Sequence, residues 1–259
     1  MKEMMPRVSV LVPVYNRAAY LVDALQTLCA QTWPDLEVIL ADDGSDDETP
    51  AIIEAVAEGR ILLPERERRQ GTFTIRSVRQ KHQGVSAARN LALSAASGSF
   101  IAFLDSDDLW MPEKAEKQVR YLLNNPTCNI VFCGYENFID AGAEEISEEQ
   151  RQLLSEVIPD YMASAMVRRE VFDRIGSFSV KLRRGEDSEW VMRAKLLGEN
   201  KGDMIPEVLY KRRIHAGNIT LTRTEDDKFF EMACIAEMIR NVNMIRRKNG
   251  KDSSSDTGL

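Results

Sequence analysis

The sequence predicts an α/β fold with a mostly parallel sheet flanked by helices. Two observations carry this prediction. Short apolar segments rich in β-branched residues alternate, as far as Cys133, with segments whose apolar residues recur at helical spacing. Such alternation implies βαβ units with right-handed crossovers. Three of the apolar segments also run directly into polar or acidic loops, and ligands of such sheets bind at the carboxyl ends of the strands.

The first half of the chain supplies the alternating elements. Strands are expected where residues are continuously apolar or alternate with period two, at 8–12, 36–41, 72–78, 99–104 and 129–133. Helices are expected between them, at 21–28, 46–58, 85–96 and from Pro112 onward. Trp33-Pro34 is expected to end the first helix, and Gly59 and Gly98 to end the next two. Ser45 and Glu48 have capping-box spacing, and Pro112 suits a first helical turn.

The second half is less regular. An acidic linker or insertion is expected at 140–156, strands at 162–167 and 207–214, and helices at 169–175 and 188–197. A long helix at 225–248 has a broad apolar face, formed by Phe229, Met232, Ile235, Ala236, Ile239, Val242 and Ile245. The predicted organisation is a main domain over 1–220, with halves 6–110 and 111–220, a C-terminal amphipathic helix over 221–250, and a Ser-rich disordered tail over 251–259.

Composition narrows the class of protein. The 259 residues are 44% hydrophobic and 29% charged with a formal net charge of -7, which argues against general nucleic-acid binding. The chain has no apolar run long enough to cross a bilayer and its start lacks the apolar core of a signal peptide, so a cytoplasmic location is expected. Four scattered cysteines indicate reduced thiols. With only two histidines, a bound metal must be held mainly by carboxylates, as Mg²⁺ or Mn²⁺ is.

The segment Asp105-Ser106-Asp107-Asp108 is the strongest candidate for chemistry. It places three carboxylates within four residues at the end of the most apolar strand, where their mutual repulsion is poorly screened. A divalent cation relieves that repulsion and also binds a diphosphate. The alternative is helix capping before Pro112, which accounts for one aspartate, Asp108.

Two further acidic motifs also have two interpretations. Asp42-Asp43-Gly44-Ser45 is either a surface turn with a helix cap, or a pair of carboxylates that accept hydrogen bonds from a nucleobase N–H or ribose hydroxyls. Glu186-Asp187 either complements the positive end of a helix, or supplies the general base that deprotonates an acceptor hydroxyl.

Together these motifs resemble glycosyltransferase family 2. The segments that carry the resemblance over residues 6–220 occur in the order found in that family: 10–17 (VLVPVYNR), 31–33 (QTW), 37–45 (EVILADDGS), 83–90 (QGVSAARN), 103–108 (FLDSDD) and 185–187 (GED). The resemblance implies the GT-A fold, a nucleotide-sugar donor and inversion at the anomeric carbon.

The resemblance also implies roles for single residues. Pro13 and Tyr15 would border the base, with Tyr15 stacked on it, and Asp43 would accept from the base N–H. Arg17 and Arg89 would lie near the nucleotide, while Asp105 with the adjacent Ser106 would approach the ribose. Asp107 would bind the metal and Asp187 would be the base, with Asp42, Asp108 and Glu186 as secondary candidates. His215 either belongs to a loop that closes over the donor and binds the metal, or is a surface histidine.

Several alternatives stay open. The chain departs from the family pattern at 60–81, which is long and basic, and at 140–161, and both segments could face the acceptor. A sugar nucleotidyltransferase competes, although 13–17 has no glycine for a phosphate loop, and so does a non-catalytic nucleotide-sugar-binding protein. The acceptor is a saccharide, a lipid-linked saccharide, a peptide or a small molecule, and the donor base is expected to be uracil. The C-terminal helix packs on the main domain or a second copy, or contacts a membrane peripherally through its basic end at 246–248.

Overall fold

The structure, a computed structural model, describes residues 5–61, 72–139, 161–182, 184–215 and 227–252. Within these residues lies one eight-stranded sheet of order β3-β2-β1-β4-β7-β6-β8-β5. The strands are β1 Val8–Val14, β2 Leu36–Asp42, β3 Phe73–Arg79, β4 Phe100–Phe103, β5 Leu109–Trp110, β6 Ile130–Ile139, β7 Met166–Arg168 and β8 Asp203–Ile214. The helices are α1 Leu21–Cys29, α2 Thr49–Ala57, α3 Val85–Ala95, α4 Lys114–Asn124, α6 Arg169–Ile175, α7 Glu186–Leu196 and α8 Asp227–Asp252, with a 3-10 turn, η1, at Met162–Ser164.

The strand order confirms the predicted α/β fold and explains where the loops meet. Strands β3, β2, β1 and β4 are mutually parallel, and β1 lies between β2 and β4. The short strand β7 is antiparallel to both β4 and β6, whereas β8 is parallel to β6 and carries β5 antiparallel on its other edge. The loops that follow β1, β2 and β4 therefore leave the same edge of the sheet side by side.

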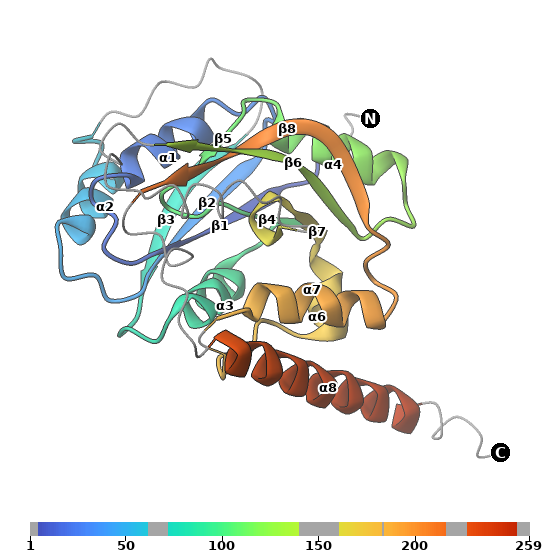
Figure 1. The fold of residues 1–259 in the computed structure, drawn as a ribbon. Coiled ribbons are helices and arrows are strands. Elements are labelled where there is room, and N and C mark those ends of the chain that lie inside the picture. The colour runs from blue at the N-terminus through green and yellow to red at the C-terminus, as the bar shows by residue number, and fades with distance from the viewer. Residues whose placement is uncertain (1–4, 62–71, 140–160, 183, 216–226, 253–259) are drawn as a thin grey trace.

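Helices cover both faces of the sheet (Figure 1). On β1, the buried Val8, Val10 and Val12 belong to one core with residues of α1, α2 and α4. Leu11 points the other way, into a second core with residues of α3, α6 and α7. A strand buried on both faces explains why the sequence of β1 is apolar at every position except Ser9 rather than alternating.

Some predicted helix boundaries differ from those of the structure. Helix α2 begins at Thr49 with Glu48 as its N-cap and no capping side-chain bond, because the Ser45 hydroxyl accepts from the Asn16 backbone N–H instead. Helix α4 begins at Lys114, so Pro112 lies in the turn before the helix rather than in its first turn. Helix α1 ends at Cys29, before the predicted stop at Trp33.

The second half is close to the prediction, with different boundaries. The predicted strand at 162–167 is divided between η1 and β7, and β6 continues six residues beyond Cys133, to Ile139. Helix α7 starts at Glu186, two residues earlier than predicted, with Gly185 as its N-cap at φ 72°. The expected linker at 140–156, residues 62–71 of the basic stretch at 60–81, and residues 253–259 of the tail lie outside the described residues.

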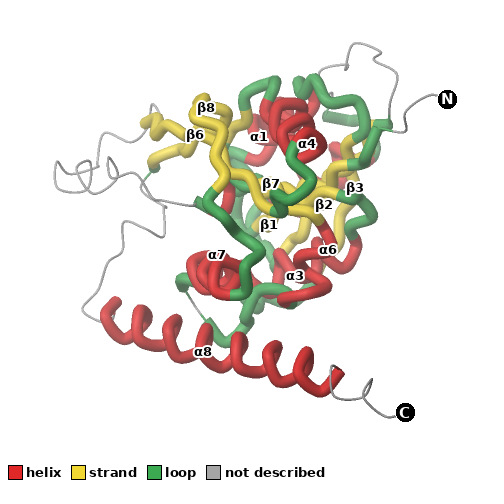
Figure 2. Tube along the Cα trace, turned by 90° about the vertical axis from the view of Figure 1, so that its right-hand side faces the viewer, coloured by secondary structure: helices red, strands yellow, loops and turns green. Residues whose placement is uncertain are grey.

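Helix α8 lies against α7 as an outer layer (Figure 2). Val242 and Ile245 pack inward as predicted, but Ile235 and Ile239 are 54% and 50% exposed. The rest of the packed face is polar, because α7 and the segment before it offer hydrogen-bond partners. The hydrogen bonds of this face of α8 join Cys234 Sγ to Gly185 O (3.3 Å), Glu237 Oε1 to Ser179 Oγ (3.1 Å) and Asn241 Nδ2 to Glu189 Oε1 (3.0 Å).

The exposed face of α8 is not covered by the rest of the described chain, and two hypotheses about its partner stay open. Contact with a second copy and peripheral contact with a membrane both stay predictions. The helix itself continues through Lys251 and Asp252, two residues beyond its predicted end at residue 250. No helix in the described part of the chain is long and apolar enough to span a bilayer.

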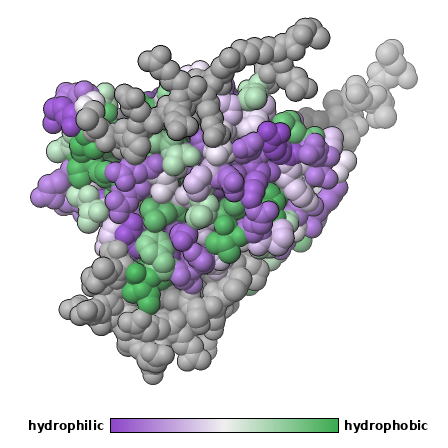
Figure 3. Space-filling model, turned by 90° about the horizontal axis from the view of Figure 1, so that it is seen from above, coloured by the Kyte–Doolittle hydropathy of each residue, from purple (hydrophilic) through white to green (hydrophobic). Residues whose placement is uncertain are grey.

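The surface over β8 and α4 has no single large apolar area. In the view from this side, hydrophobic residues form several separate groups among hydrophilic ones (Figure 3). Exposed apolar side chains on β6 and β8 include Ile139, Met204 and Val208. Scattered exposed apolar residues of this kind are normal on a protein surface.

Candidate active site

The loop after β1 joins the two acidic loops on either side of it. The Asn16 amide Nδ2 donates to Asp46 (2.7 Å), and Asn16 itself adopts φ 51°, a left-handed conformation that asparagine tolerates. The backbone N–H of Arg17 donates to Thr49 Oγ1 (2.8 Å), while its Nε donates to Asp107 Oδ2 (3.0 Å). The loops after β1, β2 and β4 therefore form one continuous site, as the motif analysis requires.

Asp42 has a structural role within this edge. Its buried carboxylate accepts the Ser45 backbone N–H (2.9 Å) and pairs with Arg79 Nε (3.1 Å). Gly44, at φ 78°, completes the turn, and a Cβ at this position would come within 2.8 Å of the His82 backbone nitrogen. The turn after β2 is thus packed directly against the loop that precedes α3.

Asp43 binds that same loop. Its Oδ1 accepts from Gln80 Nε2 (2.7 Å) and the Gln83 backbone N–H (2.9 Å), and its Oδ2 accepts the Gly84 backbone N–H (2.7 Å). His82 Nδ1 lies 2.9 Å from the same Oδ2, and the His82 ring stacks on Tyr15 with centroids 4.0 Å apart. Tyr15 is 38% exposed and Pro13, one of its neighbours in sequence, is buried within β1.

A buried cation links the acidic loop after β4 to the start of α7. The Arg89 guanidinium donates to Asp105 Oδ1 (3.1 Å) and to Glu186 Oε1 (2.9 Å). The side chains of Arg89 and Glu186 are 7% and 8% exposed. Burial raises the pKa of Glu186 to about 6, although the charge of Arg89 acts in the opposite direction. Three segments that are distant in sequence are therefore held together by one side chain.

Asp107 meets the other histidine. His215 Nε2 lies 3.1 Å from Asp107 Oδ2, the oxygen that also accepts from Arg17, and both Asp107 and His215 are buried. Burial by itself raises the pKa of Asp107, but the hydrogen bond to His215 and the charge of Arg17 outweigh it, so the pKa lies below its usual value. The placement of His215 beside Asp107 agrees with the interpretation of a site histidine rather than a surface one.

These residues fit a hard divalent cation that shares its ligands with a diphosphate. Asp107 offers a carboxylate oxygen and His215 an imidazole nitrogen, and Mg²⁺ sites commonly combine one or two carboxylates with substrate phosphates and water. The guanidinium of Arg17 on the same oxygen shows that this point attracts positive charge. Within the described ranges no group of three or more His, Cys, Asp or Glu side chains gathers to hold a metal without such help.

Asp108 corrects the capping hypothesis. Helix α4 starts six residues later, and Asp108 instead accepts from the Tyr210 hydroxyl (2.7 Å) and the Arg213 backbone N–H (2.7 Å), both in β8. Burial, together with the charges of Asp107 and Asp105, raises the pKa of Asp108 well above its usual value. Asp108 thus fixes the acidic loop to β8, and Ser106 is buried within the same loop.

Asp187 differs from Glu186 in exposure. It is half-buried in the first turn of α7, and its Oδ1 accepts the Ser188 backbone N–H (2.7 Å). Glu186 is committed to Arg89, whereas Asp187 retains access to solvent. Asp187 is therefore the more accessible of the two carboxylates.

Sequence reasoning missed four residues of this site. The sequence marks His82 only as one of two histidines. Tyr161, whose hydroxyl donates to Asp105 Oδ2 (3.3 Å), is the last residue of the segment 140–161 that departs from the family pattern. Tyr210 and Arg213 lie on β8; the Arg213 side chain donates to the Asp107 carbonyl (2.8 Å). For Tyr210 and Arg213 the available signal is that both are polar residues inside the predicted strand that leads to His215.

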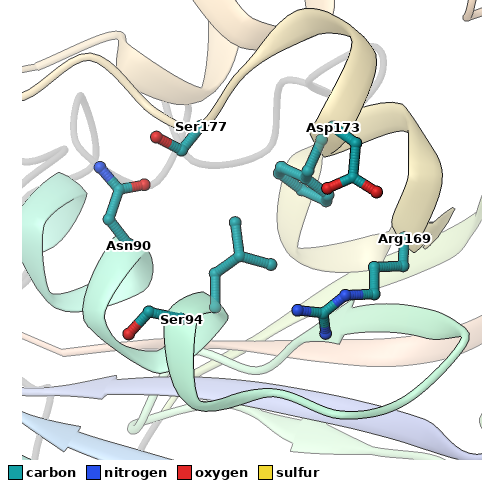
Figure 4. Close-up of a pocket in the computed structure, with 7 residues that line it drawn as sticks. Asn90, Ser94, Arg169, Asp173 and Ser177 are labelled. Atoms are coloured by element: carbon teal, nitrogen blue, oxygen red, sulfur yellow. The ribbon is translucent and has the colours of Figure 1, made fainter.

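A separate surface cavity of about 330 Å³ lies between α3 and α6. Asn90 and Ser94 from α3 face Arg169 and Asp173 from α6 across it (Figure 4). Arg169 donates to the Ala96 carbonyl, before the start of β4, whereas the acidic loop follows the end of that strand. The cavity therefore lies between helices on one face of the sheet, and no residue of the acidic loops lines it.

The sheet, its helical layers and the acidic edge at the ends of β1, β2 and β4 define a GT-A fold, a class of nucleotide-sugar transferases. The family model of Glycosyl transferase family 2 matches residues 9–183. The chain therefore belongs to that family, as its motifs predict.

Relatives and solved structures agree with this assignment. An uncharacterized glycosyltransferase of Rickettsia felis is 30% identical over 224 residues, which are 83% of this chain and 34% of the relative. The structure of Staphylococcus aureus TarS 1-349 in complex with UDP is similar with a TM-score of 0.62 and 20% identity, over 92% of this chain and 65% of that one. Mannosyltransferase PcManGT from Pyrobaculum calidifontis, in complex with GDP-Man and Mn²⁺, gives 0.63 and 24%, over 83% and 59%.

These likenesses differ in what they establish. At 20% and 24% identity the two structures show a shared fold. The chain spans only about a third of the Rickettsia relative and about two thirds or less of the two solved chains. The family and the fold are thus shown, and the donor, acceptor and chemistry of this chain follow as proposals.

Proposed function

We propose that the protein is an inverting glycosyltransferase that moves a sugar from a nucleoside-diphosphate donor, with uracil as the base, to an acceptor hydroxyl or other nucleophile. The observation that carries the proposal is the convergence of Tyr15, Asp43 and Asp107 on one edge of the sheet. Arg17 spans the distance between the loops of Asp43 and Asp107 through its bonds to Thr49 and Asp107. A nucleotide that reaches from an aromatic ring to a cation site requires this arrangement.

The base end of the proposed site lies at Tyr15 and Asp43. An exposed tyrosine ring offers a stacking surface, and a carboxylate beside it accepts from the ring N–H of uracil. Asp105 follows β4, next to β1 in the sheet, and would approach the ribose, with Arg89 keeping its carboxylate in place.

The diphosphate end lies at Asp107. Asp107 and His215 would hold a divalent cation, with Arg17 as a second positive charge beside the phosphates. A bound Mn²⁺ or Mg²⁺ would offset the charge that builds up on the departing diphosphate. In the PcManGT complex, Mn²⁺ accompanies GDP-Man on the same fold.

Proton transfer is assigned to Asp187. Its half-buried carboxylate would take the proton from the acceptor as the acceptor oxygen attacks the anomeric carbon from the face opposite the diphosphate. General base catalysis of this kind is worth about 10²–10⁴ in rate. A single displacement inverts the configuration, so the product anomer reports on the mechanism.

One pair of variants tests these roles. Asp187→Asn should abolish transfer and leave donor binding unchanged, whereas Asp107→Ala should lose the Mn²⁺-dependent part of UDP binding. Asp173→Asn, an exposed carboxylate of α6, is the matched control and should behave as wild type. Binding is measured by calorimetry with and without Mn²⁺, and turnover by UDP release from UDP-sugars. Equal turnover in wild type and Asp187→Asn would remove Asp187 from its role.

The two alternatives give different results in the same assays. A sugar nucleotidyltransferase would release diphosphate from a nucleoside triphosphate when given a sugar phosphate. A non-catalytic binding protein would bind UDP-sugars without releasing UDP. The absence of any glycine in 13–17 disfavours the first, because phosphate loops use glycine to let the backbone approach the phosphates.

A further inference from the structure

His82 makes two contacts that resemble those of a nucleobase. Its ring is stacked on Tyr15, with centroids 4.0 Å apart and planes inclined by 27°. Its Nδ1 lies 2.9 Å from Asp43 Oδ2 and 3.2 Å from the Asp43 carbonyl oxygen. Because both neighbours of Nδ1 are acceptors, this nitrogen carries the proton and donates it.

A uracil or guanine base at this point would make the same pair of contacts. Each has a planar ring that stacks on an aromatic side chain, and each has a ring N–H that a carboxylate accepts. A centroid separation of 4.0 Å is a direct stack and leaves no space for a third ring between Tyr15 and His82. The imidazole and the base therefore compete for one position.

We propose that His82 occupies the nucleobase position when no nucleotide is bound, and that the incoming base displaces it. The inference rests on the proposed function, because it takes Tyr15 and Asp43 as the base site. His82 then sets the nucleotide affinity of the protein, since each binding event must first break both contacts of the imidazole.

The surroundings of His82 allow such an exchange. The His82 side chain is 54% exposed, so it can rotate into solvent. Asp43 stays in place without it, because Gln80, Gln83 and Gly84 hold the carboxylate with three other hydrogen bonds. Loss of the His82 contact therefore releases one acceptor position on Asp43 and leaves the loop attached.

Two variants separate the contacts. His82→Ala removes both the stack and the hydrogen bond, and His82→Phe retains only the stack. Calorimetry with UDP and with GDP should show binding to His82→Ala about tenfold tighter than to wild type, equivalent to about 1.4 kcal/mol, and an intermediate value for His82→Phe. Inorganic diphosphate with Mn²⁺ has no base and should bind all three proteins equally.

The histidine can also be observed directly. The chain has only two histidines, so ¹H–¹⁵N spectra of the imidazoles contain two sets of signals. The His82 set, assigned by its absence from His82→Ala, should show the Nδ1-protonated tautomer in the free protein. It should lose that pattern when UDP saturates the site.

The outcomes distinguish this inference from the function it rests on. If wild type and His82→Ala both bind UDP or GDP, but His82→Ala binds no more tightly or the His82 signals do not change, the inference is wrong and the proposed donor site survives. If neither protein binds either nucleotide with Mn²⁺ present, the proposed donor site fails, and the inference fails with it.

Discussion

The ion pair between Arg89 and Glu186 yields the most direct prediction about stability. Arg89 contacts Glu186 and Asp105 at 2.9 and 3.1 Å, and the arginine is 7% exposed. Two unit charges about 4 Å apart interact by about 4 kcal/mol at an effective dielectric constant of about 20. Removal of one partner of a buried pair costs about 3–5 kcal/mol, because the other charge is left unpaired. Arg89→Met should therefore lower the free energy of unfolding by that amount.

The assay is urea unfolding at pH 8, where Glu186 is ionised because its pKa is about 6. Glu186→Gln should cost less than Arg89→Met, since Arg89 retains Asp105. The double variant should be more stable than the sum of the single effects predicts, by about 1–2 kcal/mol. Arg174→Met is the control, because the Arg174 pair with Glu199 lies at the surface with the arginine 41% exposed, and should cost less than about 1 kcal/mol. A loss below about 1 kcal/mol for Arg89→Met, or strict additivity, would refute the reasoning.

Three other predictions concern pH and backbone strain. Burial lowers the pKa of Lys114 from 10.5 to about 8, so between pH 8 and 10.5 the unfolded chain holds a proton that the folded chain has lost. The free energy of unfolding should therefore rise by about 3 kcal/mol as the pH increases across that window, and Lys114→Met should lack this rise in pH-dependent unfolding. The pKa of Glu186 is shifted in the other direction, from 4.5 up to about 6, so folding takes up a proton between these pH values. The free energy of unfolding of wild type should therefore increase by about 2 kcal/mol relative to Glu186→Gln as the pH falls from above 6 to below 4.5. Gly44→Ala should destabilise the protein by about 1–3 kcal/mol in urea unfolding, because alanine is strained at φ 78° and its Cβ meets the His82 backbone. Gly59→Ala is the control, because the space around Gly59 is open, and an equal loss in both variants would show that the contact with His82 does not matter.

The first half of the fold could be predicted because its signals are local. A strand buried on both faces is mostly apolar, and β1, β2 and β4 are, with Ser9 in β1 and Glu37 and Asp42 in β2 as the polar exceptions. The acidic loops meet only if these strands are neighbours, and the structure places β1 between β2 and β4. The antiparallel insertion of β7 between β4 and β6 could not be predicted, because a strand of three residues has no pattern of its own.

The site was predictable in its motifs and less so in its contacts. Asp105 and Asp107 stand out as carboxylates after an apolar strand, whereas Asp187 is singled out by the resemblance to the family. The partners Tyr161 and Tyr210 come from segments more than 50 residues away, and Tyr210 is marked only as a polar residue within a predicted strand. Capping at Ser45 failed for a related reason, since a distant backbone N–H competed for its hydroxyl.

The attachment of α8 to the start of α7 has a practical consequence. Cys234 closes over the carbonyl of Gly185, the residue immediately before the Glu186-Asp187 pair, and Asn241 holds Glu189 one turn further on. A shortened recombinant version that ends at the last family motif would leave those partners facing water. The minimal unit for expression and crystallisation should therefore retain the chain through Asp252, although the family match itself ends at residue 183.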